Sequence, residues 1–465
     1  MTPVHAENGF SVRGARVVVV GAARSGLAAA GLLRDRGAEV TLSERRPEVG
    51  PPVDALRETG VRVETGEHRA ETFELADLVV LSPGVPPDLV ELAAARRRGI
   101  PVISEIELAS RWLKGPVVAV TGTKGKSTTT TLVGRMLAEG GVRVLVGGNI
   151  GTPLSAQVPL SSTETVHVVE VSSFQLEGTV RFRPAIAVLL NLTTDHLDRH
   201  GSMEAYREAK GRIFANQEPS DWAEINADDP DVLALAARGR ARRLHFGRHL
   251  ETEGVTIEGG TIVRRQDGRG VALVPLSAIR LLGSHQTDDV MAAAGVSSIL
   301  GVDAAALTRA VRSFAGLEHA LERVAEHRGV TFVNDSKATN VDAARRAIEA
   351  FANDVVVIMG GRFKGGDLGS LRGPLSARAG RVVAIGEARH ALRQALGPLV
   401  VAEAASIEEA VDIAYRLAGG TGTVLLAPAC ASFDMFADYA DRGRRFKAAV
   451  EGLSAAGEEA PRSER

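Results

Sequence analysis

One segment limits the possible folds of this chain more than any other: residues 118–128 read VAVTGTKGKST. An apolar run precedes the glycines and a helical pattern over residues 129–139 follows them, which predicts a strand, a tight loop and a helix. Glycines let backbone N–H groups converge on an anion, and the start of the helix adds partial positive charge. The alternative is a strand-to-helix turn that carries Gly-Lys-Ser by chance. We therefore predict a phosphate-binding loop.

ATP is the expected ligand of this loop. Lys126 can reach the β- and γ-phosphates, and Ser127 can ligate Mg²⁺. The general pattern has a glycine where this chain has Val120, so the loop is expected to be shortened. The candidate nucleotide-binding residues are Gly122, Thr123, Lys124, Gly125, Lys126, Ser127 and Thr128.

Short β-branched runs alternate with Ala/Leu/Arg-rich stretches, and this pattern restarts three times. It predicts an α/β protein of three domains, at residues 1–114, 115–314 and 315–465. We expect a Rossmann-like N-terminal domain, a central P-loop domain that binds ATP on a parallel sheet, and a Rossmann-like C-terminal domain. The expected strands are residues 16–20, 39–42, 116–120, 167–171, 185–191, 330–333, 355–359, 382–385 and 424–426. The expected helices are 27–36, 129–139, 202–214, 291–300 and 342–351, with a hairpin over 251–270 and a disordered end over 457–465.

Composition excludes several classes of protein. The chain has 465 residues, and its 55 Lys+Arg against 57 Asp+Glu give a formal net charge of −2, which argues against a nucleic-acid or membrane-surface binder. The single cysteine, Cys430, forms no intrachain disulfide, and the N-terminus shows no signal-peptide pattern. The apolar runs are shorter than the roughly 20 residues that a membrane helix needs. These features predict a cytoplasmic protein without a membrane segment.

A second glycine turn, residues 21–26 (GAARSG), follows the first expected strand and opens a helix. Glu44 follows the next strand, where a ribose-binding acid often lies in dinucleotide-binding folds. Alanine replaces the middle glycine of that fingerprint, so two interpretations stand equal. The turn binds a nucleotide-like ligand, or it packs the helix tightly against the sheet.

Acidic and histidine side chains follow two expected strands of the central domain. Glu170 lies at the end of one strand, and Asp195-His196 follows the next. Because ligands of open α/β sheets bind outside the carboxyl ends of strands, Glu170 and His196 join Ser127 as candidate Mg²⁺ ligands. Histidine is a less usual Mg²⁺ ligand, and its alternative role is a hydrogen-bonded pair with Asp195. The pattern around Lys210 alone indicates a solvated helix lysine.

Eight motifs occur in a specific order: Ser82-Pro83-Gly84 and residues 121–128, 147–151, 170–177, 194–196, 334–340, 360–367 and 428–436. Together they resemble the Mur ligase family of peptidoglycan synthesis, over almost the whole chain. The resemblance implies that the first domain binds the UDP end of the substrate, the central domain binds ATP and Mg²⁺, and the third supplies part of the amino-acid site. The third-domain motifs are similar to those of the members that add D-glutamate.

The resemblance implies a role for each matching residue. Lys126, His196 and Lys210 are the implied catalytic residues. Ser127 and Glu170 are implied to hold one Mg²⁺, and His196 with a carbamylated Lys210 a second, because a carbamate supplies the anionic oxygen that this cation prefers. The implied substrate-binding residues are Ser25, Glu44, Ser82, Asn149 and Ser172 for UDP-N-acetylmuramoyl-L-alanine, and Lys337, Thr339, Lys364, Ser432 and Tyr439 for D-glutamate, with Asp335 on the nucleotide.

The implied reaction is amide-bond formation through an acyl phosphate, catalysed by a monomer with small-molecule substrates. The alternatives are a sister Mur ligase or a folylpolyglutamate synthase-like enzyme that adds another amino acid. A third alternative, from another class, is a non-catalytic nucleotide-binding regulator of the same fold.

The chain departs from the family pattern in the nucleotide site. Ala320 stands where arginine is usual, with Arg323 as the candidate to compensate. Gln286 and Asp289 stand where asparagines are usual, and Lys124 replaces a frequent asparagine. We therefore expect altered ATP affinity or base selectivity with intact phosphate chemistry.

Overall fold

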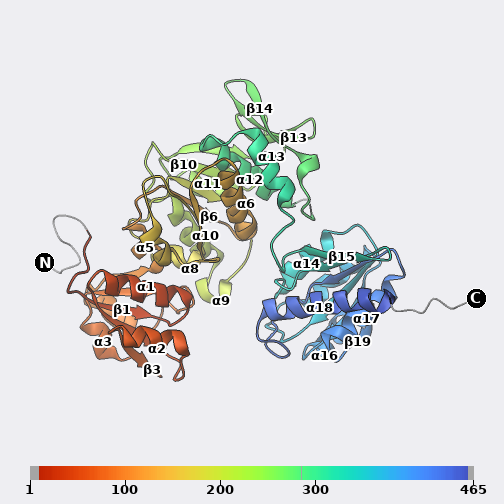
Figure 1. Cartoon of the computed structure of the whole chain (residues 1–465), viewed down its shortest axis with the longest axis horizontal. Helices are drawn as coiled ribbons and strands as arrows, with labels where there is room; N and C mark the ends of the chain where they lie inside the picture. The colour runs from red at the N-terminus through yellow and green to blue at the C-terminus, as the bar shows by residue number, and fades with distance from the viewer. Residues whose placement is uncertain (1–9, 284, 459–465) are drawn as a thin grey trace, which may run out of the picture. The chain divides into compact units, whose positions relative to one another are not determined.

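The computed structural model describes residues 10–283 and 285–458 (Figure 1). The chain forms two compact units: residues up to Ile279 with Asp288–Val311 make the first, and Arg280–Thr287 with the chain from Arg312 make the second. The first unit contains a five-stranded and a nine-stranded sheet, and the second contains a six-stranded sheet. The predicted α/β class is confirmed.

The five-stranded sheet is parallel throughout, in the order β3-β2-β1-β4-β5. Its central strand β1 is built from valines that are buried on both faces, as expected for a parallel sheet covered by helices. The elements are β1 (Arg16–Val20), α1 (Arg24–Asp35), β2 (Glu39–Glu44), α2 (Pro51–Glu58), β3 (Arg62–Thr65), α3 (Ala70–Glu74), β4 (Leu78–Leu81), α4 (Val90–Arg97), β5 (Val102–Ser104) and α5 (Glu105–Ser110).

The nine-stranded sheet has the order β14-β13-β12-β11-β10-β9-β6-β8-β7. Strands β6 to β11 are parallel, and β12, β13 and β14 form an antiparallel extension that confirms the predicted hairpin. Its strands are β6 (Val117–Thr121), β7 (Val144–Gly148), β8 (Val166–Glu170), β9 (Ile186–Leu189), β10 (Trp222–Asn226), β11 (Arg242–Phe246), β12 (Gly254–Glu258), β13 (Thr261–Gln266) and β14 (Arg269–Pro275). Its helices are α6 (Lys126–Glu139), α7 (Leu154–Gln157), α8 (Ser173–Glu177), α9 (Leu197–His200), α10 (Met203–Gly211), α11 (Pro230–Ala236), α12 (His285–Ile299) and α13 (Ala304–Ser313).

Helix α5 and the residues beside it connect these two sheets within the first unit. The buried Glu107 carboxylate accepts hydrogen bonds from the backbone amides of residues 180–182 at 2.9, 3.0 and 2.8 Å. The Ser104 amide donates to the Gly178 carbonyl oxygen at 2.9 Å. Trp112 packs against the cores of both sheets. The joint is therefore a packed interface with its own hydrogen bonds to a buried carboxylate.

The six-stranded sheet has the order β15-β16-β20-β17-β18-β19, parallel except for the β15–β16 pair. Cys430 is buried after β20, and burial raises the pKa of its thiol to about 12. The elements are β15 (Glu322–His327), β16 (Val330–Asn334), α14 (Val341–Glu349), β17 (Val355–Gly360), α15 (Arg372–Ser376), β18 (Arg381–Ile385), α16 (Arg389–Leu396), β19 (Val400–Glu403), α17 (Ile407–Ala418), β20 (Thr423–Leu426) and α18 (Tyr439–Glu458).

Several helices begin earlier than the sequence pattern predicted. Helix α6 starts at Lys126 instead of residue 129, because Gly125 turns directly into the helix with φ 82° and the threonines that follow are weak helix formers. Helix α12 starts at His285 instead of residue 291, since its first turn is polar.

Helix α18 runs to Glu458, so the disorder predicted for residues 457–465 is wrong for the first two residues, and residues 459–465 lie outside the described part. No helix in residues 10–283 and 285–458 is both long and apolar enough to cross a membrane.

Candidate active site

The phosphate loop lies at the carboxyl end of β6 and runs directly into α6. Two hydrogen bonds anchor its backbone to Asn191: the Thr123 amide donates to the Asn191 carbonyl oxygen, and the Lys124 amide donates to Asn191 Oδ1, both at 2.9 Å. Lys126 Nζ lies over the loop and donates to the carbonyl oxygens of Gly122 and Thr123 at 3.0 and 2.8 Å. The predicted strand–loop–helix geometry is present, and the ammonium group lies where an anion in the loop would meet it.

Glu170 brings the predicted residues Ser127 and Asn149 together. It ends β8 and is 2% exposed. Its Oε2 accepts a hydrogen bond from Ser127 Oγ at 2.6 Å, and its Oε1 accepts one from Asn149 Nδ2 at 2.8 Å. A hydroxyl and a carboxylate oxygen this close suit a hard cation. The described residues contain no group of three or more His, Cys, Asp or Glu that could hold a metal, so water and phosphate oxygens would have to complete the coordination shell of a Mg²⁺ ion here.

Lys210 is buried, which corrects the solvated lysine that its pattern indicated. It is 1% exposed, and its Nζ donates to the Gly122 carbonyl oxygen at 2.8 Å and to Thr121 Oγ1 at 3.3 Å. Burial, together with the nearby Lys126 charge, lowers the pKa of Lys210 well below its usual value. A neutral amine is therefore favoured, and only a neutral amine can take up carbon dioxide to form a carbamate.

His196 is the N-cap of α9 and lies in the left-handed backbone region, with φ 55°. Its Nδ1 lies 4.0 Å from Asp195 Oδ1, and Asp195 Oδ2 pairs with Lys124 Nζ at 3.1 Å. The Tyr206 ring lies 6.4 Å from the His196 ring and 4.9 Å from Lys210 Nζ. His196, Tyr206 and Lys210 therefore lie beside the phosphate loop. The sequence pattern did not predict the ion pair between the Lys124 ammonium and Asp195.

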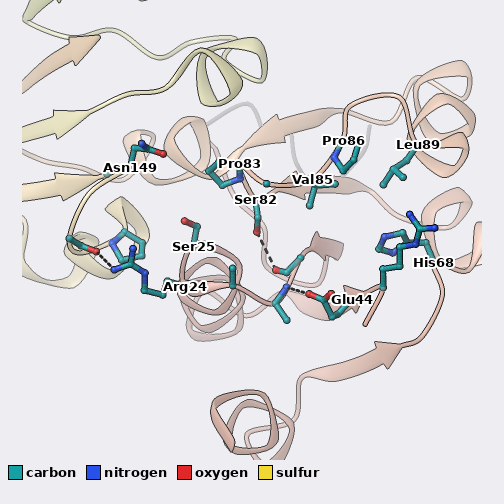
Figure 2. Close-up of a pocket in the computed structure, with 18 residues that line it drawn as sticks. Arg24, Ser25, Glu44, His68, Ser82, Pro83, Val85, Pro86, Leu89 and Asn149 are labelled. Atoms are coloured by element: carbon teal, nitrogen blue, oxygen red, sulfur yellow. Dashed lines mark hydrogen bonds between the residues drawn. The ribbon is translucent and has the colours of Figure 1, made fainter. Parts of the chain in front are cut away.

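A cavity of about 420 Å³ opens between the N-terminal glycine turn and the loop after β7 (Figure 2). Four residues predicted to bind substrate line it: Ser25, Glu44, Ser82 and Asn149. The glycine turn forms one wall of this cavity, and it also packs closely, as the second of its two interpretations expects. A Cβ on Gly26 would lie 1.8 Å from the Gly21 carbonyl oxygen.

Local hydrogen bonds hold the polar wall of the cavity. Glu44 accepts from the Ala22 amide at 2.7 Å, and Ser82 Oγ donates to the Gly21 carbonyl oxygen at 3.1 Å (Figure 2). Glu44 also accepts from the Arg46 amide at 3.0 Å. Burial alone would raise the pKa of Glu44, but the hydrogen bonds from Arg46 and Ala22 leave that pKa below its usual value. The carboxylate is therefore ionised and oriented.

Sequence reasoning missed three polar residues of the cavity: Arg24, Arg45 and His68. Arg24 Nη1 donates to the Gly151 carbonyl oxygen at 3.2 Å, so it joins the two sides of the cavity (Figure 2). His68 Nδ1 lies 2.8 Å from Ser43 Oγ. Arg24 lies inside the glycine turn, where the pattern already pointed to a ligand, whereas no spacing rule singles out His68.

Ser172 has a local structural contact besides its predicted role. It is the N-cap of α8, where its Oγ accepts from the Gln175 amide at 3.2 Å and Gln175 Oε1 accepts from the Ser172 amide at 3.0 Å. This reciprocal pair is a capping box.

In the second unit, the predicted residues follow the carboxyl ends of parallel strands. Asp335, Lys337 and Thr339 follow β16, Lys364 follows β17, and Ser432 and Tyr439 follow β20. Burial raises the pKa of Asp335 to about 7. Lys337 is exposed, Lys364 Nζ lies 5.9 Å from the Phe433 ring, Ser432 is buried and Tyr439 is 41% exposed.

Arg442 is a buried residue of the second unit that sequence reasoning missed. It extends from α18 and donates to Ser336 Oγ and to the Ser336 carbonyl oxygen, both at 2.9 Å, and to the Cys430 carbonyl oxygen at 3.2 Å. Burial lowers its pKa to about 10. Arg442 thereby ties the loop of Lys337 to the loop of Ser432.

The residues that depart from the family pattern differ in their burial and in their contacts. Asp289 is buried against the phosphate loop: its Oδ1 lies 2.1 Å from the position that a Cβ on Gly125 would take. Burial and the negative charge of the neighbouring Asp288 raise the pKa of Asp289 well above its usual value. Gln286 is buried as well. Arg323 is exposed on the edge strand β15 and pairs with Glu326, so nothing in its contacts supports compensation for Ala320.

Comparisons with known proteins show which family the chain is similar to. Models of three Mur ligase domains match the chain: the MurD-like N-terminal domain at residues 15–104, the middle domain at 120–297 and the glutamate ligase domain at 321–430. A protein of Acidobacterium capsulatum named UDP-N-acetylmuramoylalanine--D-glutamate ligase is 47% identical, covering 94% of this chain and 96% of that protein. A protein of the same name from Geotalea uraniireducens is 44% identical over 94% and 97%.

Solved structures share the fold. The MurF ligase of Thermotoga maritima in complex with ADP aligns with a TM-score of 0.60 at 18% identity, over 95% of this chain and 96% of that one. The UDP-N-acetylmuramate-alanine ligase MurC of Thermotoga maritima aligns with a TM-score of 0.59 at 22% identity, over 95% and 100%. Since domain matches span most of the sequence and relatives cover nearly all of it, the chain belongs to the Mur ligase family.

Proposed function

We propose that this protein is an ATP-dependent ligase that joins D-glutamate to UDP-N-acetylmuramoyl-L-alanine during peptidoglycan synthesis. The relatives that cover 94–97% of both chains carry that activity in their names. The single observation that carries the proposal is the contact of Glu170 with both Ser127 of the phosphate loop and Asn149 of the cavity. This contact would bring a nucleotide in the phosphate loop next to a substrate in the cavity.

The reaction joins a carboxyl group to an amine in two steps. The substrate carboxylate attacks the γ-phosphorus of ATP, the bond from that phosphorus to ADP breaks, and an acyl phosphate forms. The D-glutamate amine then attacks the acyl carbon, phosphate leaves, and the amine gives up a proton. Lys126 offsets the negative charge on the transferring phosphoryl group, and the remaining task of the protein is to position the reactants.

Mg²⁺ is the metal that this chemistry requires, because it neutralises phosphate charge and polarises the phosphoryl group. Ser127 and Glu170 would hold one ion, and His196 with a carbamylated Lys210 a second. The burial of Lys210 lowers its pKa and so favours the uncharged amine from which a carbamate forms.

The second unit would bind D-glutamate. Lys337 and Lys364 supply two cations for a dicarboxylic amino acid. Thr339 lies on the loop of Lys337, Ser432 on the loop after β20, and Tyr439 begins α18. Asp335 would contact the nucleotide. Under this proposal the protein acts as a monomer in the cytoplasm, and its domain boundaries lie at 114/115 and 314/315.

The test is release of phosphate from ATP and Mg²⁺ with UDP-N-acetylmuramoyl-L-alanine, comparing D-glutamate with L-glutamate, L-lysine and meso-diaminopimelate. We expect release with D-glutamate alone and a product of the matching amide mass. Release with another amino acid would identify a sister ligase. ATP binding without turnover would indicate a regulator, the alternative that Ala320, Gln286 and Asp289 motivate.

A further inference from the structure

Arg199 connects two loops of the candidate active site that belong to different sheets of the first unit. Its Nη1 donates a hydrogen bond to the Pro83 carbonyl oxygen at 3.1 Å, and Pro83 lines the cavity of about 420 Å³. Arg199 itself lies on α9, whose N-cap is His196. One side chain therefore links the wall of the cavity to the turn that carries His196.

Phe174 and Glu177 hold the guanidinium group of Arg199 in place. Its central carbon lies 4.0 Å from the centroid of the Phe174 ring, and that ring lies 4.9 Å from the His196 ring. Glu177 Oε2 lies 3.7 Å from Arg199 Nη2, and Glu177 Oε1 lies 3.0 Å from His200 Nδ1. The Arg199 side chain is only 17% exposed, so water competes weakly with these contacts.

Helix α9 depends on such side-chain contacts. It spans four residues, which is too short to be stable alone. His196 has a left-handed backbone that a non-glycine residue adopts only when its surroundings enforce it. The contacts of Arg199 and His200 therefore hold the short helix that follows His196.

We propose that Arg199 is a positioning residue that couples occupation of the UDP-substrate cavity to the placement of His196. The inference rests on the proposed function, because it assigns the cavity to UDP-N-acetylmuramoyl-L-alanine. A ligand in the cavity fixes the loop of Pro83, and the hydrogen bond to Arg199 passes that constraint to α9. UDP-N-acetylmuramoyl-L-alanine and ATP with Mg²⁺ then favour each other's binding, since each stabilises the same placement of α9 and His196.

Calorimetry tests this coupling. The affinity for UDP-N-acetylmuramoyl-L-alanine is measured with and without Mg²⁺ and a non-hydrolysable ATP analogue, and the ratio is the coupling factor. We expect a factor above one in the wild type and close to one in Arg199→Ala. We also expect kcat of Arg199→Ala to fall by about 10²-fold, the cost of a small misplacement in an active site, with a smaller change in the KM of each substrate.

Two further variants separate positioning from folding. Arg199→Lys retains a donor for Pro83 but not a planar group that lies over Phe174, so we expect partial recovery of the coupling factor. Arg207→Ala is the matched control, because it removes an arginine of neighbouring α10 that pairs with Asp231. It should leave the coupling factor unchanged. An unchanged factor in Arg199→Ala, or a wild-type factor of one, would overturn the inference. Phosphate release by the wild type with D-glutamate tests the proposed function separately.

Discussion

Among single residues, Glu224 is a buried carboxyl group outside the candidate active site. It lies on β10 beneath α12, where Gly295 leaves it room: a Cβ there would lie 1.9 Å from Glu224 Oε1. Burial raises the pKa of Glu224 well above the usual value, against the smaller opposing effects of Arg264 and the Val296 amide. The folded protein therefore holds this proton more tightly than the unfolded chain does.

Glu224→Gln is predicted to stabilise the protein in a pH-dependent way. The contribution of the protonated carboxyl is complete below the ordinary pKa of 4.5 and is lost as the pH rises through the folded pKa. The neutral amide avoids this loss, so we expect the free energy of unfolding to rise by about 1–3 kcal/mol near pH 8 and to change little near pH 4. Urea denaturation of both proteins across this pH range measures the effect. Parallel pH profiles would show that Glu224 does not cause it.

Lys126→Met is predicted to remove most of the activity without removing the fold. The side chain keeps its length but loses the charge that lies over Gly122 and Thr123, so kcat/KM should fall by about 10²–10³-fold. Lys114→Met, on an exposed lysine before β6, is the control and should leave turnover unchanged. Phosphate release under saturating D-glutamate makes the comparison, and equal activities would exclude Lys126 from phosphate binding.

At the scale of helices and strands, Ser172 separates a structural contribution from a functional one. Ser172→Ala removes the capping box of α8 and should cost about 1 kcal/mol of stability. Ser406→Ala removes a similar cap from α17, where the Ser406 hydroxyl accepts from the Glu409 amide at 3.2 Å. We expect equal losses of stability in thermal unfolding but a raised KM for UDP-N-acetylmuramoyl-L-alanine in Ser172→Ala only. If both variants keep the wild-type KM, Ser172 is a cap and nothing more.

The elements that could be predicted are those whose hydrophobic pattern is complete. Buried parallel strands such as β1 and β6 consist of consecutive apolar residues, and both were predicted close to their bounds. Strand β15 was missed because it is an edge strand with exposed polar residues, and β19 because it is a partly exposed strand at the other edge of the same sheet. The start of α12 was missed because a polar first turn has no apolar spacing.

The candidate site likewise contains residues that the sequence could predict and residues that it could not. Residues adjacent to glycine turns and strand ends, such as Ser127 and Glu170, follow from local sequence and lie in contact. The burial of Lys210 and the contact of Arg199 with Pro83 arise from packing between distant segments. No local pattern carries that information.

At the scale of the whole molecule, the Glu107 contacts are predicted to hold the joint between the first two sheets together until the sheets themselves unfold. Glu107→Ala leaves one buried and two partly buried amides of residues 180–182 without their acceptor, which should cost about 3 kcal/mol. The protein has two tryptophans, so in a Trp222→Phe background only Trp112 reports on the joint. We expect Glu107→Ala to lower the urea midpoint of Trp112 fluorescence below that of circular dichroism. Coincident, unshifted transitions would show that other contacts hold the joint.

The buried thiol of Cys430 has a practical consequence for experiments on domain motion. Thiolate is the species that reacts with maleimide dyes, and a pKa of about 12 with full burial leaves almost none available in the native protein. Paired cysteines placed on exposed positions of the two units could therefore be labelled in an otherwise unaltered chain. Single-molecule energy transfer would then follow the distance between the units through each turnover, without first replacing a core residue.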